Sequence, residues 1–186
     1  MRLEKPRIAP VQDADFSPEQ KEALAPFGDR ILNIFRTLAH APKALTRFQQ
    51  WGGYVLSKRN ELPERERELV ILRTGFLCRS GYEWTQHVPI GKRAGLTEDE
   101  IARIKQGADA GWGPADAALI RAADELHDDQ FITDATWAAL SEHFTEKQRM
   151  DVVFSVGQYT QVSMMLNTFG VQLDAGQTLD PDLKAY

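Results

Sequence analysis

The residues with the clearest chemical potential lie close together in the middle of the chain. They are Glu68, Glu83 and His87, and the last two are four residues apart. On an α-helix, side chains at this spacing are neighbours on one face. A carboxylate beside an imidazole raises the basicity of the imidazole and orients its ring, and histidine titrates nearest to neutral pH. The pattern predicts a site for general acid/base catalysis, in which protons move to and from a substrate.

Two helices joined by a short break would position these groups. Pro63 suits the first position of a helix, and the apolar residues that follow recur at spacings of three and four, which indicates one buried face: Leu69, Leu72, Phe76 and Leu77. A second helix is predicted to begin at Ser80, because Ser80 and Glu83 have the spacing of a capping box. That cap is an alternative role for Glu83. Glu68 can reach His87 only if the two helices pack antiparallel.

This segment resembles the carboxymuconolactone decarboxylase-like superfamily, which includes the alkylhydroperoxidase D (AhpD) proteins. The resemblance rests on Glu68, Cys78, Tyr82-Glu83-Trp84, His87 and Ala94-Gly95-Leu96. Weaker agreement extends it over most of the chain, through Asn33, Arg36, Leu38-Ala39-His40, Pro42 and Leu166-Asn167-Thr168-Phe169-Gly170-Val171. The resemblance implies an all-α fold, an AhpD-like helical bundle built around an antiparallel helix pair, and assembly as a homo-oligomer.

The sequence departs from the peroxidase branch of this superfamily at two positions. In that branch a C-x-x-C pair precedes a histidine by four residues, and aligning that histidine with His87 places the two thiol positions on Ser80 and Glu83. Neither residue is a cysteine, and Cys78 has no second cysteine in the chain to resolve it. The chain therefore looks like the decarboxylase-like side, the branch lacking the pair. We expect a cofactor-free lyase or isomerase step, such as decarboxylation, on a small organic acid or lactone.

Two other functions remain open. One is a peroxidase-like reductase that uses Cys78 with an external thiol. The other is a helical oligomer that binds a ligand without catalysis. On that reading His87 would be a structural, hydrogen-bonded histidine, and Glu68 would belong to an exposed, ion-paired face.

Further residues are interpreted as contacts of a substrate pocket. Tyr82 and Trp84 are expected to form pocket walls, and Cys78 is either a small buried hydrophobe or part of the lining. Three polar residues are candidate substrate contacts, with structural hydrogen bonding as the alternative: Arg36, His40 and Asn167. An arginine would suit a substrate with a carboxylate. The pair Glu83 and His87 has the spacing of helical metal ligands, but HExxH is absent and no two histidines stand at helical spacing, so we expect no metal.

Composition sets the broad limits. The chain has 186 residues, a net charge of −5, and 42% hydrophobic residues, which is typical of one globular domain and argues against a nucleic-acid partner. We expect an extended arm at 1–16, a helical domain at 17–171 and an irregular tail at 172–186. No apolar run is long enough to span a bilayer and no signal peptide is evident. One cysteine fits a reducing cytoplasm.

Capping boxes mark three other helix starts, at Ser17, Thr97 and Thr145. The helix from Thr145 is predicted to run to about Thr168 and to be central or at a subunit interface, because its apolar residues lie on more than one side. An earlier helix contains the pair Gly52-Gly53. Glycine weakens a helix interior, so the pair is tolerable there if another backbone approaches closely.

Overall fold

The protein is all-helical in the computed structural model, which describes residues 1–184. Within this range there are nine α-helices and no strand: α1 (Pro18–Leu24), α2 (Asn33–Leu38), α3 (Pro42–Val55), α4 (Glu64–Leu77), α5 (Gly81–Ala94), α6 (Glu98–Ile104), α7 (Pro114–Asp128), α8 (Asp134–Ser141) and α9 (Glu146–Phe169). Short 3-10 turns occupy Asp13–Asp15, Ala25–Phe27 and Pro181–Leu183. None of the described helices is both long enough and apolar enough to cross a membrane.

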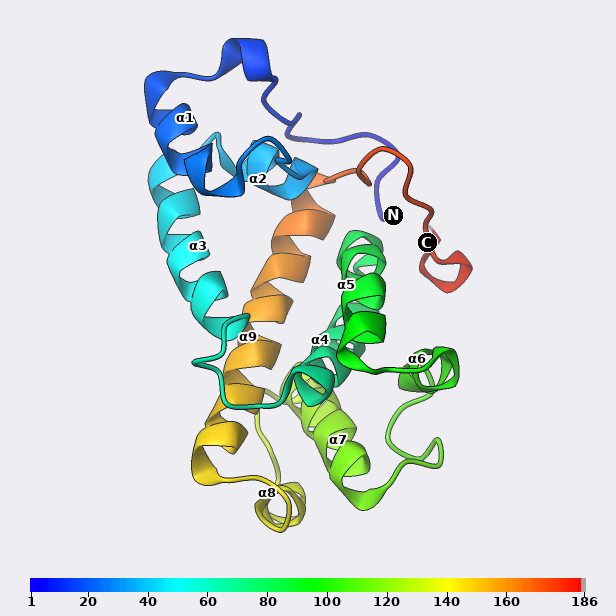
Figure 1. Cartoon of the computed structure of the whole chain (residues 1–186). Helices are drawn as coiled ribbons and strands as arrows, with labels where there is room; N and C mark the ends of the chain where they lie inside the picture. Colours follow the sequence, from blue (N-terminus) through cyan, green and yellow to red (C-terminus); the bar gives the residue numbers. More distant parts are fainter. Residues whose placement is uncertain (185–186) are drawn as a thin grey trace.

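Helix α4 is the centre of the bundle. It packs against α5, α7 and α9, and every residue from Arg67 to Gly75 is buried (Figure 1). The prediction of a single buried face was therefore too narrow, because α4 is enclosed on all sides. It also places the charged side chains of Arg67, Glu68 and Arg73 in the interior. Such side chains are found buried only when other groups satisfy them, so they mark where the polar interactions of the core lie.

Helix α5 follows α4 after a tight reversal and runs back along it, as the predicted antiparallel pair requires (Figure 1). Arg79 in the reversal has a left-handed backbone with φ 53°, and the Ser80 N–H donates to the carbonyl of Gly75 at 2.9 Å. Ser80 precedes the helix as predicted, but its side chain makes no capping hydrogen bond. The capping box at Ser80 and Glu83 was wrong, because the Glu83 carboxylate turns to His87 instead.

The other three predicted capping boxes are confirmed, at Ser17, Thr97 and Thr145. The last of these begins α9, which crosses the molecule beside α3 and α4 (Figure 1). One face of α9 is buried, whereas Met150, Val153 and Met164 are exposed. This helix therefore contributes both to the core and to an apolar surface.

The first residues of the chain and the segment that ends at residue 184 lie against the bundle, close to each other (Figure 1). The N–H of Arg7 donates to the Phe169 carbonyl at the end of α9 at 2.8 Å, and the amino group of Met1 donates to the Leu183 carbonyl at 3.0 Å. The arm therefore packs on its own chain. The last two residues of the predicted tail lie outside the described residues. The division into arm, domain and tail stays a prediction.

Candidate active site

The structure brings Glu68, Glu83 and His87 into direct contact in the interior. Nδ1 of His87 lies 2.7 Å from Oε2 of Glu68, across the α4–α5 interface. Its other ring nitrogen, Nε2, lies 3.1 Å from Oε1 of Glu83, one turn earlier on α5. The exposed fractions are 1% for Glu68, 4% for Glu83 and 6% for His87. One imidazole is thus held between two carboxylates with almost no access to bulk water.

The pKa values of Glu83 and His87, the two site residues on α5, are both raised. Burial raises the pKa of Glu83 to about 7; the His87 charge opposes this rise and the Glu68 charge adds to it. Burial alone would lower the pKa of His87, but the neighbouring carboxylates of Glu83 and Glu68 outweigh it, so the net pKa is raised. Titration near the operating pH is what a general acid or base needs.

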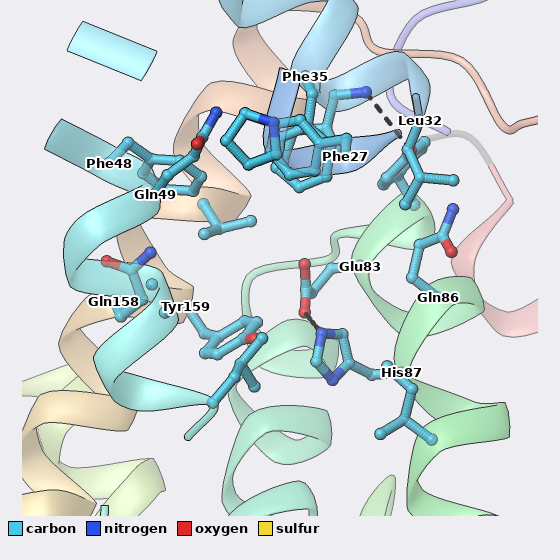
Figure 2. A pocket seen from close by; sticks show the side chains of 18 residues that line it. Phe27, Leu32, Phe35, Phe48, Gln49, Glu83, Gln86, His87, Gln158 and Tyr159 are labelled. Atoms are coloured by element: carbon cyan, nitrogen blue, oxygen red, sulfur yellow. Dashed lines mark hydrogen bonds and ion pairs between the residues drawn. The ribbon is translucent and has the colours of Figure 1, made fainter. Parts of the chain in front are cut away.

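Glu83 and His87 form part of the wall of a cavity of about 420 Å³. Figure 2 shows one carboxylate oxygen of Glu83 turned to the His87 ring and the other directed into the cavity. Most of the remaining wall is apolar and comes from α2, α3, α5, α9 and the turn before α2: Pro26, Phe27, Leu32, Ile34, Phe35, Phe48, Gly52, Gly53, Leu56, Ile90 and Val162. Five polar residues complete it: Gln49, Tyr82, Gln86, Gln158 and Tyr159. Glu68 is not on this wall and reaches the cavity only through His87.

Two residues of α9 complete the site, and the sequence interpretation missed both. The ring of Tyr159 meets the His87 ring edge-on, with centroids 4.8 Å apart. Burial, together with the charges of Glu83 and Glu68, raises the pKa of Tyr159 well above its ordinary value, so its hydroxyl stays protonated. Its neighbour Gln158 is also buried and faces the same cavity (Figure 2). The sequence did contain one signal for them, because both are polar residues within a largely apolar helix.

Glycine residues leave room for the Glu83 side chain and for the cavity. A Cβ on Gly75 of α4 would stand 3.1 Å from Cγ of Glu83, so any larger residue would press on this side chain. Gly52 and Gly53 of α3 line the cavity; a Cβ would meet only Gln158 at Gly52, and nothing within 4 Å at Gly53. Within residues 1–184, no other backbone therefore approaches this pair closely. The pair borders open space instead.

A tail residue positions part of the wall. The Tyr82 hydroxyl donates to Oδ2 of Asp174 at 2.6 Å, and the Gln86 amide donates to the same oxygen at 2.7 Å. The other oxygen of Asp174 accepts from the Asn33 N–H at the start of α2 at 2.8 Å. Burial and this carboxylate raise the pKa of Tyr82. Asp174 therefore joins α5 to α2, and Tyr82 lies on the cavity wall.

Two other expected pocket residues lie elsewhere. Trp84 points into the core on the other side of α5, where it contacts Phe76 and its Nε1 donates to Asp180 at 3.1 Å. Cys78 ends α4 outside the cavity wall, and burial raises the pKa of its thiol. A thiol with a raised pKa has little of the reactive thiolate at neutral pH.

The three candidate substrate contacts instead interact with backbone carbonyl groups of this chain. Arg36 donates to the Val11 carbonyl at 3.1 Å and pairs with Asp13. His40 contacts the Ala9 carbonyl at 2.9 Å, and Asn167 donates to the Cys78 carbonyl at 2.9 Å. The first two fix the N-terminal arm, and the third fixes the reversal before α5. None of the three lines this cavity, and their observed contacts are those of the structural alternative.

The comparison with protein families agrees with this arrangement. Residues 42–125 match the Carboxymuconolactone decarboxylase family. The match runs from the start of α3 into α7 and includes Glu68, Glu83 and His87, so it confirms the resemblance seen in the sequence. The single cysteine of this carboxymuconolactone decarboxylase-like chain fits the branch without a C-x-x-C pair. Among curated proteins there is no significant match.

Solved structures show that the fold is AhpD-like. An uncharacterized peroxidase-related protein with an alkylhydroperoxidase AhpD core, from Ralstonia eutropha JMP134, superposes with a TM-score of 0.79 at 20% identity, over 91% of this chain and 93% of that one. A peroxidase-related protein from Silicibacter sp. TM1040 gives 0.72 at 14% identity, over 93% and 91%. The debrominase Bmp8 in complex with 2,3,4-tribromopyrrole gives 0.72 at 12% identity, over 92% and 94%. At these identities the likeness concerns the fold alone.

The site contains no metal-binding arrangement within residues 1–184, where no group of three or more His, Cys, Asp and Glu side chains could hold an ion.

Proposed function

We propose that this protein is a carboxymuconolactone decarboxylase-like enzyme that performs acid/base chemistry at a carbon next to a carbonyl group, as a lyase or isomerase acting on a small organic acid or lactone. The observation that supports this most directly is the buried contact of His87 with two carboxylates, one of which faces a mostly apolar cavity. Because the three side chains are almost completely buried, bulk water competes little with proton transfer among them.

The positions of the two carboxylates support separate roles for Glu68 and Glu83. Glu68 makes the short contact to Nδ1 and lies behind the ring, so it is the residue that orients His87. Glu83 lies on the wall beside His87 and shares a proton with it. We assign proton transfer with the substrate to this pair.

The chemistry then proceeds in two proton transfers. Ionised Glu83 removes a proton from the carbon next to the substrate carbonyl, and the electron pair of the broken C–H bond moves into the enolate. His87 stabilises the acid thus formed, or takes its proton through the 3.1 Å contact. The pair then returns a proton to carbon at another position of the enolate, which completes an isomerisation; after loss of carbon dioxide, the same return would complete a decarboxylation.

Hydrogen exchange at carbon tests the proposal without knowledge of the natural substrate. α-Angelica lactone and 2-tetralone, two carbonyl compounds with acidic C–H bonds, would be incubated with the protein in D₂O and followed by NMR. We expect protein-dependent deuterium uptake that falls at least about 100-fold in His87→Gln and Glu83→Gln, the usual size of a general acid/base contribution. Glu142→Gln, which changes an exposed carboxylate after α8, is the matched control. Unchanged exchange in His87→Gln would refute the proposal.

The position of Cys78 weighs against the peroxidase-like alternative. The thiol is outside the cavity and has a raised pKa, whereas a peroxide-reducing cysteine must be an accessible thiolate. The proposal therefore predicts equal peroxide consumption by the wild type and Cys78→Ser in the presence of added thiol.

The proposal includes a homo-oligomer in the cytoplasm. The exposed side of α9 has no charged residue between Met150 and Thr168, and Trp51 of α3 is exposed as well. Apolar patches of this kind mark interfaces between proteins. Met164 is 63% exposed. We expect Met164→Glu to reduce the size of the assembly in light scattering and to leave the helical circular dichroism spectrum unchanged. The lone, half-buried Cys78 suits a reducing compartment.

A further inference from the structure

The charges around the cavity bear on the class of substrate. Of the residues that line it, Glu83 is the only one with an acidic side chain, and no lysine or arginine is on the wall within the part of the chain that the structure describes. His87 on the wall can carry a positive charge, but Glu68 and Glu83 already balance it. A bound carboxylate would therefore lose its hydration without a free cation to pair with, which is costly in an apolar surrounding. It would also face the charge of Glu83 whenever that residue is ionised.

The buried charged residues next to the cavity, which do not line it, do not make the cavity more favourable for an anion. Glu68 adds a second carboxylate next to His87. Arg67 is a cation close to them, with 5% of its surface exposed, and its guanidinium is directed to the Ser57 carbonyl at 3.5 Å. Because Arg67 does not line the cavity, it can offset the charge of the carboxylates but cannot pair with a ligand. Arg36, which would have suited an acid, is paired with Asp13 elsewhere.

The polar groups that do face the cavity suit an uncharged ligand. The amide N–H groups of Gln49 and Gln86 already donate to the Ala23 carbonyl and to Asp174. Gln158 is different, since within residues 1–184 its buried Oε1 has no hydrogen-bond partner. Its Oε1 can accept from a hydroxyl or N–H group of a ligand, and its amide N–H can donate to a carbonyl, without placing a charge in the cavity. Such a buried, unpartnered group indicates that a ligand completes its hydrogen bonding.

The shape of the cavity suits a ring. Phe27 and Phe35 are stacked at 3.7 Å between centroids, and Phe48 stands beside them on the wall (Figure 2). A volume of about 420 Å³ is in the usual range for a small-molecule site. Flat apolar ligands pack well against aromatic rings.

We infer that the cavity selects an uncharged, ring-containing carbonyl compound, such as a lactone or cyclic enone, and rejects carboxylates. This inference rests on the proposed function and narrows it, because a neutral substrate favours the isomerase step over the decarboxylation of a free acid. The Gln158 amide would hydrogen-bond the polar group of the ligand, with Oε1 accepting from a hydroxyl or N–H or the amide N–H donating to a carbonyl, while Glu83 and His87 face its acidic carbon.

Matched pairs of probes separate charge from shape. Binding of phenylacetamide and phenylacetate, and of indole-3-acetamide and indole-3-acetate, would be measured by calorimetry at pH 8, where both acids are ionised. We expect each amide to bind at least about tenfold more tightly than its acid. Gln158→Leu should weaken the amides and leave the acids as weak as before, because it removes a hydrogen-bonding group and keeps the volume.

A variant designed to bind acids provides the second part of this experiment. Leu56 is exposed at the end of α3 and lines the cavity, so Leu56→Arg adds a guanidinium at its edge and should bring the affinities of acid and amide within about threefold of each other. Gln50→Arg adds the same charge to an exposed position of α3 off the cavity wall and should leave the preference unchanged.

Acids that bind as tightly as amides in the wild type would overturn the inference, as would amides that do not bind at all. Neither result depends on turnover, so the acid/base proposal stands or falls separately on deuterium exchange.

Discussion

The buried pair Glu83 and His87 should make the protein less stable as the pH rises from about 5 to 8. Folded Glu83 keeps its proton up to a pKa of about 7, whereas a carboxyl with the ordinary value of 4.5 is already ionised in the unfolded chain. Between these values the folded state binds more protons, so the free energy of unfolding falls with rising pH. His87 acts in the same direction. Its raised pKa contributes stability below 6.5 that is lost as the pH rises through the folded value.

The size of the effect follows from the Glu83 values. The interval from 4.5 to about 7, at roughly 1.4 kcal/mol per pH unit, corresponds to a loss of about 3 kcal/mol. This is an appreciable part of the total stability of a domain. Coupling to His87 distributes the same protons over two groups, so the measured change belongs to the pair.

Urea unfolding at constant ionic strength and protein concentration would measure this loss in half-unit steps of pH. We expect Glu83→Gln to flatten the dependence between pH 5 and 8, because the amide cannot ionise. The exposed Glu142→Gln control should keep the wild-type slope. If wild type and Glu83→Gln lost stability in parallel, or if the wild type became more stable with rising pH, the assignment of a buried protonated carboxyl would be refuted.

Three further substitutions test other parts of the structure. Gly53→Ala should raise stability by about 0.5–1 kcal/mol in thermal unfolding, since the added methyl group meets no atom within 4 Å; a loss would mean that this part of α3 is covered. Asp174→Asn should lower the pKa of Tyr82 in an ultraviolet absorbance titration, because it removes the carboxylate that accepts from the hydroxyl; an unchanged titration would argue against that hydrogen bond. Asp151→Ala should destabilise the protein by about 3 kcal/mol or more in urea, because this fully buried carboxylate accepts from the Tyr54 hydroxyl at 2.8 Å; a change below about 1 kcal/mol would contradict its structural role.

Local patterns in the sequence were sufficient to predict the helices and to find Glu68, Glu83 and His87, but not the site residues of α9. The capping boxes at Ser17, Thr97 and Thr145 are set by residues three positions apart, so they could be found without knowledge of the fold. The link from Glu68 to His87 required only that consecutive helices pack antiparallel, which a short connection favours.

The remaining parts of the site depend on packing between distant segments. Gln158 and Tyr159 come from a helix about 70 residues further along the chain, and no local pattern says which side of α9 meets α5. For the same reason Arg36 and His40 could not be distinguished from substrate ligands: their partners are carbonyls of the arm, a segment without any helical pattern. Polar side chains that bind irregular backbone leave no periodic signal in the sequence.

Glu83 shows why a correct local pattern can still give a wrong structure. Its spacing from Ser80 fits a capping box, yet a cap at an exposed helix end contributes only about 1 kcal/mol, whereas a buried imidazole that lost one of its two carboxylates would cost more. The α4–α5 contact buries the start of α5, with Ser80 fully enclosed, and the carboxylate pairs with His87 instead. Because Glu83 occupies a position where the peroxidase branch has a thiol, the same burial that would tune a cysteine here raises a carboxyl pKa to about 7. Both thiol positions of that branch, Ser80 and Glu83, thus have oxygen-bearing side chains here, which is why the chemistry that we propose for this site is proton transfer.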